Sequence, residues 1–509
     1  MKNTNGRPER GRRRAWLMPA AAVLLALPMT ACEGLLEVDL PGSLTEDALR
    51  DPALSETLVT SAVAEFECGF VDYMRYPGQW FEEWQNSSQS RPDALSQFRS
   101  QLVGVYADPC ASGTGPIWTT IQVPRLMAAR AVEFIRYFGA NGMYTPTNLP
   151  DTTFLIAKAR LYEAYSIQLL AEQFCAVTLT APSVQDPPAS GGLVTREEAY
   201  DSAEVKFTEA INYASIVTGA RATEAARVLN AARIGRARSR LYQWQYAGGA
   251  AADVIADASA VTLNTFQMLA EYDANPARRR NRLFVSNNQN KSMQPYQDYT
   301  SLRIEADGTN TVGGEPLKGT MGVADPRVVV NIAASVATDP DGRGVGPMRR
   351  QGKFANNAAD IPFATWREAR LMIAEVDPTQ TLAIINQLRT VTTGLPAGIT
   401  FPAGGLPTIS AATWAAMTPA QRQQTLWEER RRELWMQGTQ PGDKIRWAYP
   451  AWDSADEYSG ALRDVTTIDD PLTTPTTYPL TGGDDRNGCI PIPYLERQSN
   501  SALLQILGS

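Results

Sequence analysis

The chain has 509 residues, a formal net charge of −7 and no histidine. The missing imidazole excludes Ser-His-Asp and Cys-His catalysis and every His-ligated metal site, and no CxxC pair supplies a zinc ligand set. We therefore expect neither a metal nor another cofactor. An acidic chain repels polyphosphate, so nucleic acid is not an expected partner.

The first 32 residues have the pattern of a bacterial export signal. A basic head precedes an apolar run over residues 15–29, and two small residues then lead to Cys32, which resembles a lipobox. The run is too short to span a bilayer comfortably. We predict a signal peptide over residues 1–31, lipid attachment at Cys32 and a lipid-anchored tether over residues 32–45. An ordinary cleaved signal peptide is the alternative.

The mature chain would be more acidic and would keep four cysteines besides Cys32. Removal of six basic residues and one acidic residue lowers the formal net charge from −7 to −12. The cysteines could form two disulfides in an oxidising compartment, in one of three pairings. We favour a bond between Cys68 and Cys110, because both lie in loop-like sequence. Cys175 could instead be a buried free thiol, and the pairing of Cys489 stays open.

Apolar periodicity and capping signals predict a series of helices in the first half of the chain. Apolar residues recur at helical spacing over residues 46–66 and, more clearly, over residues 154–174. Thr195 and Glu198 form a capping box that opens the next helix. Gly219 is expected to end that helix.

A further pair of helices is predicted after this one. Thr223 caps a helix that runs to about Tyr246, and residues 250–261 form its shorter antiparallel partner. Small residues along both segments allow the helices to approach closely. The pair is similar to a tetratricopeptide hairpin.

The second half of the chain changes character twice. Residues 273–362 are rich in Asn, Gln, Gly, Arg and Pro and lack periodicity, which predicts a long irregular segment. Helical pattern resumes after it. We therefore expect one mainly α domain over residues 46–509, with a helical scaffold over about 46–272 and 363–447 and with the irregular segment facing the ligand.

The last predicted helix, residues 419–437, carries closely spaced acids and bases. The spacing allows Glu428 to pair with Arg431 or Arg432, and Glu429 to pair with Arg432. Such charges usually lie in solvent, where each pair contributes little. Leucine and tryptophan side chains are interleaved with them, so we expect some of the guanidinium groups to be partly buried.

Several motifs, taken in chain order, resemble the SusD/RagB family of outer-membrane nutrient-binding lipoproteins. The family pattern has a DPR turn, a helix pair with RxAE and INxR, an arginine-rich segment, a DxxRW motif and a closing PIPxxE. The matching residues are Asp325-Pro326-Arg327, Arg370 and Glu375, Ile385-Asn386 and Arg389, Glu429-Arg430, Glu433-Leu434, Gly438, Asp443, Arg446-Trp447, Pro491-Ile492-Pro493 and Glu496.

The resemblance implies a mainly α, SusD-like fold with tetratricopeptide-like helix hairpins and long irregular loops. It also implies a lipoprotein of the outer membrane that captures a nutrient at the cell surface, an oligosaccharide or a peptide, without catalysis. The ligand would pass to a TonB-dependent, SusC-like barrel.

Sugar capture requires exposed aromatic rings beside amide, carboxylate or guanidinium groups. Two segments have this composition, and a break at Pro77-Gly78 would let two tryptophans of the first share one helix face. Aromatic residues at helical spacing usually pack inward, so a core position is the alternative. The candidate ligand-binding residues are Tyr73, Tyr76, Trp80, Trp84 and Asn86 in the first segment and Tyr296, Asp298 and Tyr299 in the second.

Two other functions stay open. An exported tetratricopeptide-type lipoprotein could act as a protein–protein scaffold, with no affinity for small ligands. A glycosidase could use a carboxylate pair that includes Glu82 or Glu83, because that chemistry needs no histidine.

Overall fold

The computed structural model describes most of the chain after the predicted signal and tether. Cys32, Cys110, Cys175 and Cys489 lie outside the described residues, so lipid attachment and cysteine pairing stay predictions. The described residues are 50–81, 83–86, 117–145, 150–174, 176–180, 182, 191–310, 322–338, 344–448, 492–493, 496 and 500–501.

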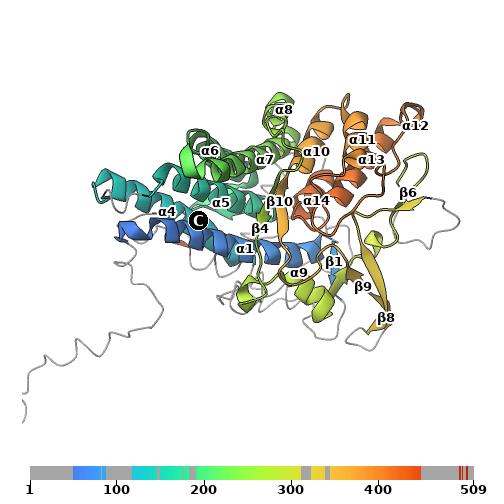
Figure 1. Cartoon of the computed structure of the whole chain (residues 1–509), viewed down its shortest axis with the longest axis horizontal. Helices are drawn as coiled ribbons and strands as arrows, with labels where there is room; N and C mark the ends of the chain where they lie inside the picture. The colour runs from blue at the N-terminus through green and yellow to red at the C-terminus, as the bar shows by residue number, and fades with distance from the viewer. Residues whose placement is uncertain are drawn as a thin grey trace, which may run out of the picture. The chain divides into compact units, whose positions relative to one another are not determined.

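Long helices make up the first half of the described chain, and consecutive helices lie side by side (Figure 1). Each of α4, α5, α6 and α7 packs against the helix before it and the helix after it. This arrangement confirms the predicted mainly α fold with tetratricopeptide-like hairpins. The elements are η2 (Pro52–Leu54), α1 (Ser55–Trp80), α4 (Ile117–Ala140), α5 (Thr152–Gln173), α6 (Arg196–Ser215), η3 (Gly219–Arg221), α7 (Ala222–Tyr246) and α8 (Ala251–Ser259).

The capping box at the start of α6 forms as predicted. The backbone N–H of Glu198 donates to Thr195 Oγ1 at 3.2 Å, and the backbone N–H of Thr195 donates to Glu198 Oε2 at 2.7 Å. Two of the four backbone donors that a helix start leaves unpaired are thereby satisfied. The predicted cap of α7 is wrong: Thr223 lies inside the helix, because a 3₁₀ turn leads into it from Gly219.

Helix α1 differs most from its prediction. The sequence predicts a helix over residues 46–66 and a break at Pro77-Gly78, whereas α1 continues through Pro77 to Trp80. The end of the helix is closed by its own backbone, since the Phe81 N–H donates to the Pro77 carbonyl at 2.8 Å. The predicted break at Pro77-Gly78 is therefore wrong. Pro77 lies in the last turn of α1, so its missing N–H costs only hydrogen bonding to carbonyls earlier in the helix.

An antiparallel strand pair connects the first helices to the C-terminal helices. Strand β4 (Gln267–Ala270) pairs with β10 (Ile361–Thr365), so the two ends of the intervening segment lie together. Strand β10 leads directly into the last set of helices. These are α10 (Trp366–Val376), α11 (Thr381–Thr390), α12 (Ala411–Ala416), α13 (Pro419–Glu433) and α14 (Gln440–Ala448).

Helix α13 ends one turn earlier than predicted. It stops at Glu433, and Met436 and Gly438 then adopt positive φ angles of 56° and 80°. A Cβ atom on Gly438 would lie 2.7 Å from the Phe70 ring, so only glycine allows this turn to approach α1 so closely.

The segment between β4 and β10 is irregular, as predicted, but it also contains short strands and a hairpin that the sequence does not indicate. The helical turns are η4 (Ala277–Arg279), α9 (Arg282–Phe284), the π-helical η5 (Val285–Gln289) and η6 (Gln297–Tyr299). Two antiparallel pairs lie within this segment: β6 (Arg303–Ile304) with β7 (Val323–Ala324), and β8 (Val330–Thr338) with β9 (Gly344–Gln351). Its strand β5 (Met293–Pro295) pairs with β1 (Trp84–Asn86), which follows α1. Outside the segment, β2 (Ala176–Thr178) pairs with β3 (Leu193–Thr195) between α5 and α6.

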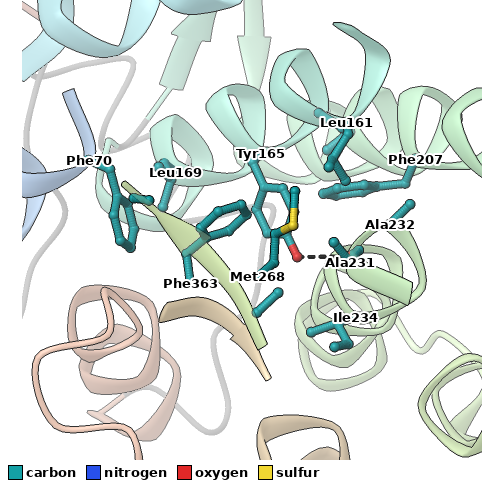
Figure 2. Packing of buried hydrophobic residues seen from close by; sticks show 14 of the residues in the cluster. Phe70, Leu161, Tyr165, Leu169, Phe207, Ala231, Ala232, Ile234, Met268 and Phe363 are labelled. Carbon is teal, nitrogen blue, oxygen red and sulfur yellow. Dashed lines mark hydrogen bonds between the residues drawn. The ribbon is translucent and has the colours of Figure 1, made fainter. Parts of the chain in front are cut away.

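One hydrophobic core joins the two sets of helices through the β4–β10 pair (Figure 2). Phe363 of β10 packs edge to face on Tyr165 of α5, with ring centroids 4.9 Å apart, and the Tyr165 hydroxyl donates to the Ala231 carbonyl of α7 at 2.8 Å. Gly235 of α7 lets α6 approach closely, since a Cβ there would lie 2.3 Å from the Phe207 ring.

Two further observations concern Cys68 and the hydropathy of the helices. Cys68 of α1 is in a disulfide, and its partner cysteine lies outside the described residues. None of the helices in the described part of the chain combines the length and the hydropathy that a bilayer crossing requires.

Candidate functional site

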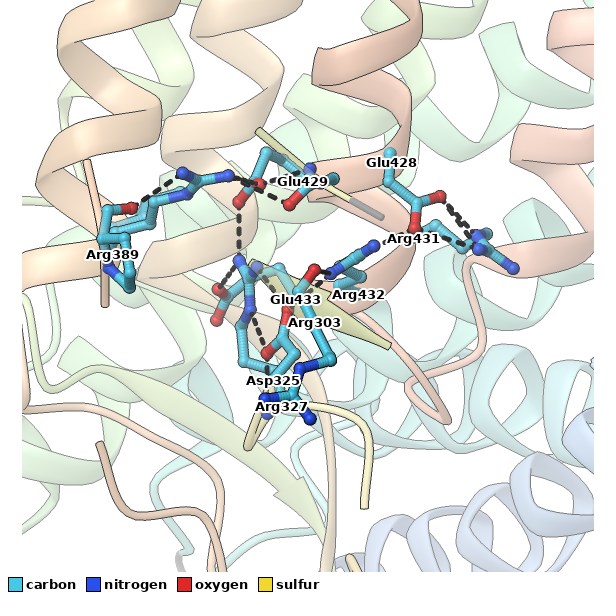
Figure 3. A network of polar contacts seen from close by, with 12 residues as sticks. Arg303, Asp325, Arg327, Arg389, Glu428, Glu429, Arg431, Arg432 and Glu433 are labelled. Carbon is cyan, nitrogen blue, oxygen red and sulfur yellow. Dashed lines mark hydrogen bonds and ion pairs between the residues drawn. The ribbon is translucent and has the colours of Figure 1, made fainter. Parts of the chain in front are cut away.

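The motif residues that carry the family resemblance form a buried ionic network (Figure 3). Arg327 of the DPR turn donates to Asp325 at 2.8 Å and to Glu429 of α13 at 2.7 Å. A third carboxylate, Glu433, lies 3.4 Å from the same guanidinium. All four side chains are at most 2 % exposed, and Arg389, Arg432 and Arg367 supply the further buried positive charges that the three carboxylates need.

The pairs within α13 follow the predicted spacing only in part. Glu428 pairs with both Arg431 and Arg432, at 2.9 and 2.7 Å. The predicted Glu429–Arg432 pair is wrong: Glu429 binds Arg327 and Arg389, whereas Arg432 also contacts Asp325 at 3.2 Å. Partners from distant segments compete successfully with the neighbour on the same helix, because they reach these side chains inside the core.

The DxxRW motif of α14 forms a second buried ionic cluster. Asp443 pairs with Arg430 at 2.7 Å and with Arg446 at 3.0 Å, and Arg446 also binds Glu375 of α10. The two guanidinium groups hold the pKa of Asp443 below its usual range despite its burial. These motif residues connect helices to one another, and their buried side chains are not available to a ligand.

Two candidate residues of the first predicted segment are in the core. Tyr73 is 0 % exposed and its hydroxyl donates to Glu172 Oε2 at 3.0 Å. Trp84 is also 0 % exposed, and it packs so tightly on α1 that a Cβ atom on Gly78 would lie 2.7 Å from its ring. Neither ring offers a face to a ligand. Both positions agree with the alternative prediction, in which these aromatic residues pack in the core.

The second predicted segment is divided between core and surface. Tyr299 is 1 % exposed, stacks on Trp435 at 5.7 Å between centroids and lies under the Arg431 guanidinium. Asp298 is exposed, and Tyr296 is half-buried. Tyr76 of the first segment is also half-buried. The side chains of Trp80 and Asn86 lie outside the described part of the structure.

The structure brings the two predicted segments together. Strand β1 pairs with β5, which places Trp84 opposite Pro295 and Asn86 opposite Met293. The backbone N–H of Tyr296 donates to the Glu83 carbonyl at 3.0 Å. More than 200 residues separate the segments, so no local pattern could reveal this contact.

Glu83, a candidate carboxylate for the glycosidase alternative, has a structural role. It is 2 % exposed, and its Oε1 atom accepts a hydrogen bond from the Met436 N–H at 2.7 Å. Burial raises the pKa of Glu83 to about 7, and it lowers the pKa of nearby Lys353 to about 7. Glu82 lies outside the described residues.

A pocket of about 170 Å³ opens between the start of α4, the end of β2 and the closing PIPxxE motif. Trp118, Val123 and Leu126 of α4 and Pro493 supply its apolar lining. Trp118 is fixed by an edge-to-face contact with Phe174, at 4.8 Å between centroids. The apolar lining is suited to the C–H face of a small ligand.

The polar lining of the pocket is held by hydrogen bonds between the three segments. Gln122 Nε2 donates to the Thr178 carbonyl at 2.9 Å, and Thr178 Oγ1 donates to Glu496 Oε1 at 2.8 Å. Arg125 donates from Nε to Gln122 and from Nη1 to the Thr180 carbonyl at 3.1 Å. Donors and acceptors therefore surround a partly apolar cavity, which is the arrangement that recognises a polyhydroxylated molecule.

Sequence reasoning missed this pocket because its lining comes from three distant segments. The sequence identifies Glu496 only as a residue of the closing motif, and no pattern singles out Trp118 as a ligand contact. One usable signal is the spacing of Trp118, Gln122 and Arg125 on a single helix face, four and three residues apart.

The helical fold of this chain is shared with solved structures of other proteins. No family model and no curated protein matches the sequence. A solved SusD/RagB-family protein from Bacteroides thetaiotaomicron matches with a TM-score of 0.53 and 14 % identity, over 92 % of this chain and 96 % of that one. The chain therefore has the SusD/RagB fold, which confirms the predicted resemblance at the level of the fold.

Two other solved structures give the same result. A SusD-like carbohydrate-binding protein from Bacteroides fragilis matches with a TM-score of 0.54 and 14 % identity, over 88 % of this chain and 98 % of that chain. A SusD superfamily protein from Parabacteroides distasonis matches with a TM-score of 0.54 and 13 % identity, over 90 % of this chain and 98 % of that chain.

Proposed function

We propose that the chain is a lipoprotein of the SusD/RagB family that captures an oligosaccharide at the cell surface and delivers it to a TonB-dependent barrel in the outer membrane. The observation that carries the proposal is the pocket at Trp118, with its apolar lining beside Gln122, Arg125 and Glu496. The shared fold with a SusD-like carbohydrate-binding protein supports it. The lipobox-like Cys32 supports the membrane anchor.

Binding without catalysis fits the lining of this pocket. Glycoside hydrolysis by the common mechanisms needs two carboxyl groups on either side of the scissile bond. Among the described residues, Glu496 is the carboxylate that lines the pocket. The partly exposed Tyr76, Tyr296 and Asp298 remain proposed contacts for further parts of a ligand on the β1–β5 side.

A glycan-binding screen tests this function. The full-length chain, purified in detergent, is titrated calorimetrically with neutral and acidic oligosaccharides and with peptides. Replacement of Gln122 by Ala removes one amide from the pocket and should weaken glycan binding about three- to ten-fold. The control Asn212→Ala changes an exposed residue of α6 that does not line the pocket and should bind as the wild type does.

Three outcomes would contradict the proposal. No affinity for any glycan would favour the scaffold alternative, in which the helix hairpins bind another protein. Tighter binding of peptides than of glycans would show that the ligand is a peptide and not an oligosaccharide. Release of shortened sugars, detected by mass spectrometry, would establish a glycosidase.

A further inference from the structure

Arg125 places a buried positive charge in the pocket with only neutral partners. Its side chain belongs to a residue that is 4 % exposed, and its hydrogen bonds run to the Gln122 amide and the Thr180 carbonyl. Among the described residues, no carboxylate forms an ion pair with it. Burial lowers the pKa of Arg125, although Glu163 and Glu496 act in the opposite direction.

Several other buried arginines among the described residues have direct carboxylate partners. Arg238 binds Glu368 at 2.6 Å, and Arg430 binds Asp443 at 2.7 Å. Glu163, the carboxylate near Arg125 on α5, is already bound by Arg160. A buried cation loses hydration that neutral acceptors replace only in part, so an anion that enters the pocket would bind where this charge lies.

Glu496 gives the pocket a second, opposite charge. Its Oε1 atom accepts hydrogen bonds from Thr178 Oγ1 at 2.8 Å and from Asn500 Nδ2 at 3.0 Å, which fixes its position. Glu496 and Arg125 line the same cavity without forming an ion pair with each other. A ligand between them meets a hydrogen-bond acceptor at one end and a cationic donor at the other.

We propose, as a refinement that depends on the proposed function, that the Trp118 pocket selects a sugar unit that carries a carboxylate, a hexuronate. The carboxylate binds the Arg125 guanidinium, whose planar fork matches a carboxylate. Ring hydroxyls donate to Glu496, and the C–H face of the ring lies on the apolar lining. The volume of about 170 Å³ suits one sugar unit rather than a long chain.

The test compares sugars that differ only in the carboxylate. The full-length chain is titrated with glucuronate and glucose, and with galacturonate and galactose. We expect at least about ten-fold tighter binding of the acidic member of the preferred pair, because a hydrogen bond to a charged group is worth more than a neutral one. High salt should reduce this preference.

Two variants assign the preference to Arg125. Arg125→Gln keeps an amide donor but removes the charge, so the ratio of acidic-sugar to neutral-sugar affinity, measured within this variant, should fall to about one. Arg125→Lys keeps the charge and should restore part of the preference. Circular dichroism establishes that both variants are folded, and the wild-type comparison stands even if one of them is not.

The outcomes separate this inference from the proposed function. Equal binding of acidic and neutral sugars by the wild type, or an unchanged preference in Arg125→Gln, would overturn the inference and leave glycan capture intact. Tighter binding of amino acids or peptide carboxylates than of hexuronates would overturn it in favour of a peptide ligand. Absence of binding to every glycan would refute the proposed function and this inference together.

Discussion

Gly78 and Trp84 show how one small residue determines where an aromatic ring lies. The indole occupies the space that a Cβ atom on Gly78 would need, so it packs against α1. The composition around Trp84 is that of a sugar-binding surface, but composition does not show which neighbour leaves room for a ring. A glycine six residues before a tryptophan does not by itself indicate that the ring packs on that glycine. The contact forms only because the chain turns back after α1 and continues as β1.

Replacement of Trp84 by Ala should therefore lower stability rather than affinity alone. Removal of a fully buried tryptophan side chain leaves a cavity and should cost about 3–5 kcal/mol in the free energy of unfolding. Urea denaturation followed by circular dichroism measures it. The control Ile216→Ala truncates a side chain that is 67 % exposed and should cost less than about 0.5 kcal/mol. Similar losses for both variants would place Trp84 outside the core.

Glu67 is a second residue whose surroundings, rather than its type, determine its behaviour. Its Oε1 atom accepts a hydrogen bond from the Glu271 N–H at 3.0 Å, and Arg279 lies 3.3 Å from Oε2. Burial nevertheless raises the pKa of Glu67 from 4.5 to about 7. Because this folded-state pKa is above the unfolded value, the stabilising contribution is complete below about pH 4.5 and is lost as the pH rises through 7.

Glu67→Gln should reduce the loss of stability between pH 5 and pH 8. A shift from 4.5 to about 7 corresponds to about 3 kcal/mol across the whole titration, and the amide keeps an acceptor for Glu271. Unfolding in urea at pH 5, 6, 7 and 8 gives the slope. Glu197→Gln removes an exposed carboxylate of α6 and serves as the control. Identical slopes for wild type and Glu67→Gln would refute the assignment.

At the scale of elements, the ionic network fixes how the irregular segment sits on the C-terminal helices. The DPR turn joins α13 through Arg327, and the same helix joins α11 through the Glu429–Arg389 pair. Replacing such buried ion pairs by apolar residues need not cost stability, but removal of one partner leaves a charge uncompensated. The network therefore makes the turn and the helices depend on one another.

Arg327→Ala should destabilise the protein by about 3–5 kcal/mol, because Asp325 and Glu429 lose a buried partner. The matched control is Arg221→Ala, whose guanidinium pairs with Glu56 and Glu224 but is 39 % exposed. That variant should lose at most about 1 kcal/mol. Chemical denaturation measures the free energy of unfolding of both variants. Equal decreases in the two variants would show that burial of the network contributes nothing to stability.

Elements with strong local signals were predictable from the sequence, and those that depend on distant partners were not. The capping box at Thr195 forms as the sequence indicates, since it involves residues three apart. The β1–β5 pair and the β8–β9 hairpin gave no usable pattern. For Glu429, helical spacing named the wrong partner, because the closest arginines in space come from other segments.

At the scale of the whole molecule, the fold was predictable because many weak motifs occur in the right order. Most of those motifs form the internal scaffold, whereas the pocket lies where three segments meet and takes only Pro493 and Glu496 from a motif. Sequence could indicate Glu496 as a motif residue, but only the structure shows that its carboxylate faces the same cavity as Arg125.

Membrane attachment is the whole-molecule property that the sequence predicts most directly. Cys32→Ala should release the protein from the membrane fraction, since no lipid can then be attached at the predicted site. Sedimentation of membranes followed by immunoblotting measures the distribution. Asn212→Ala changes an exposed residue of α6 and should leave the protein in the membrane fraction. Retention of Cys32→Ala in membranes would contradict the lipidation prediction.

The closing motif gives the pocket one of its walls, and this has a consequence for biosynthesis. Pro493 and Glu496 line the cavity, and Asn500 reaches back to the Gly191 carbonyl at 3.0 Å. A ribosome that releases the chain early yields a product without this wall. Immobilised ligand should then retain molecules that contain Pro493, Glu496 and Asn500 and let molecules truncated before them pass, so synthesis through these residues becomes a condition for binding.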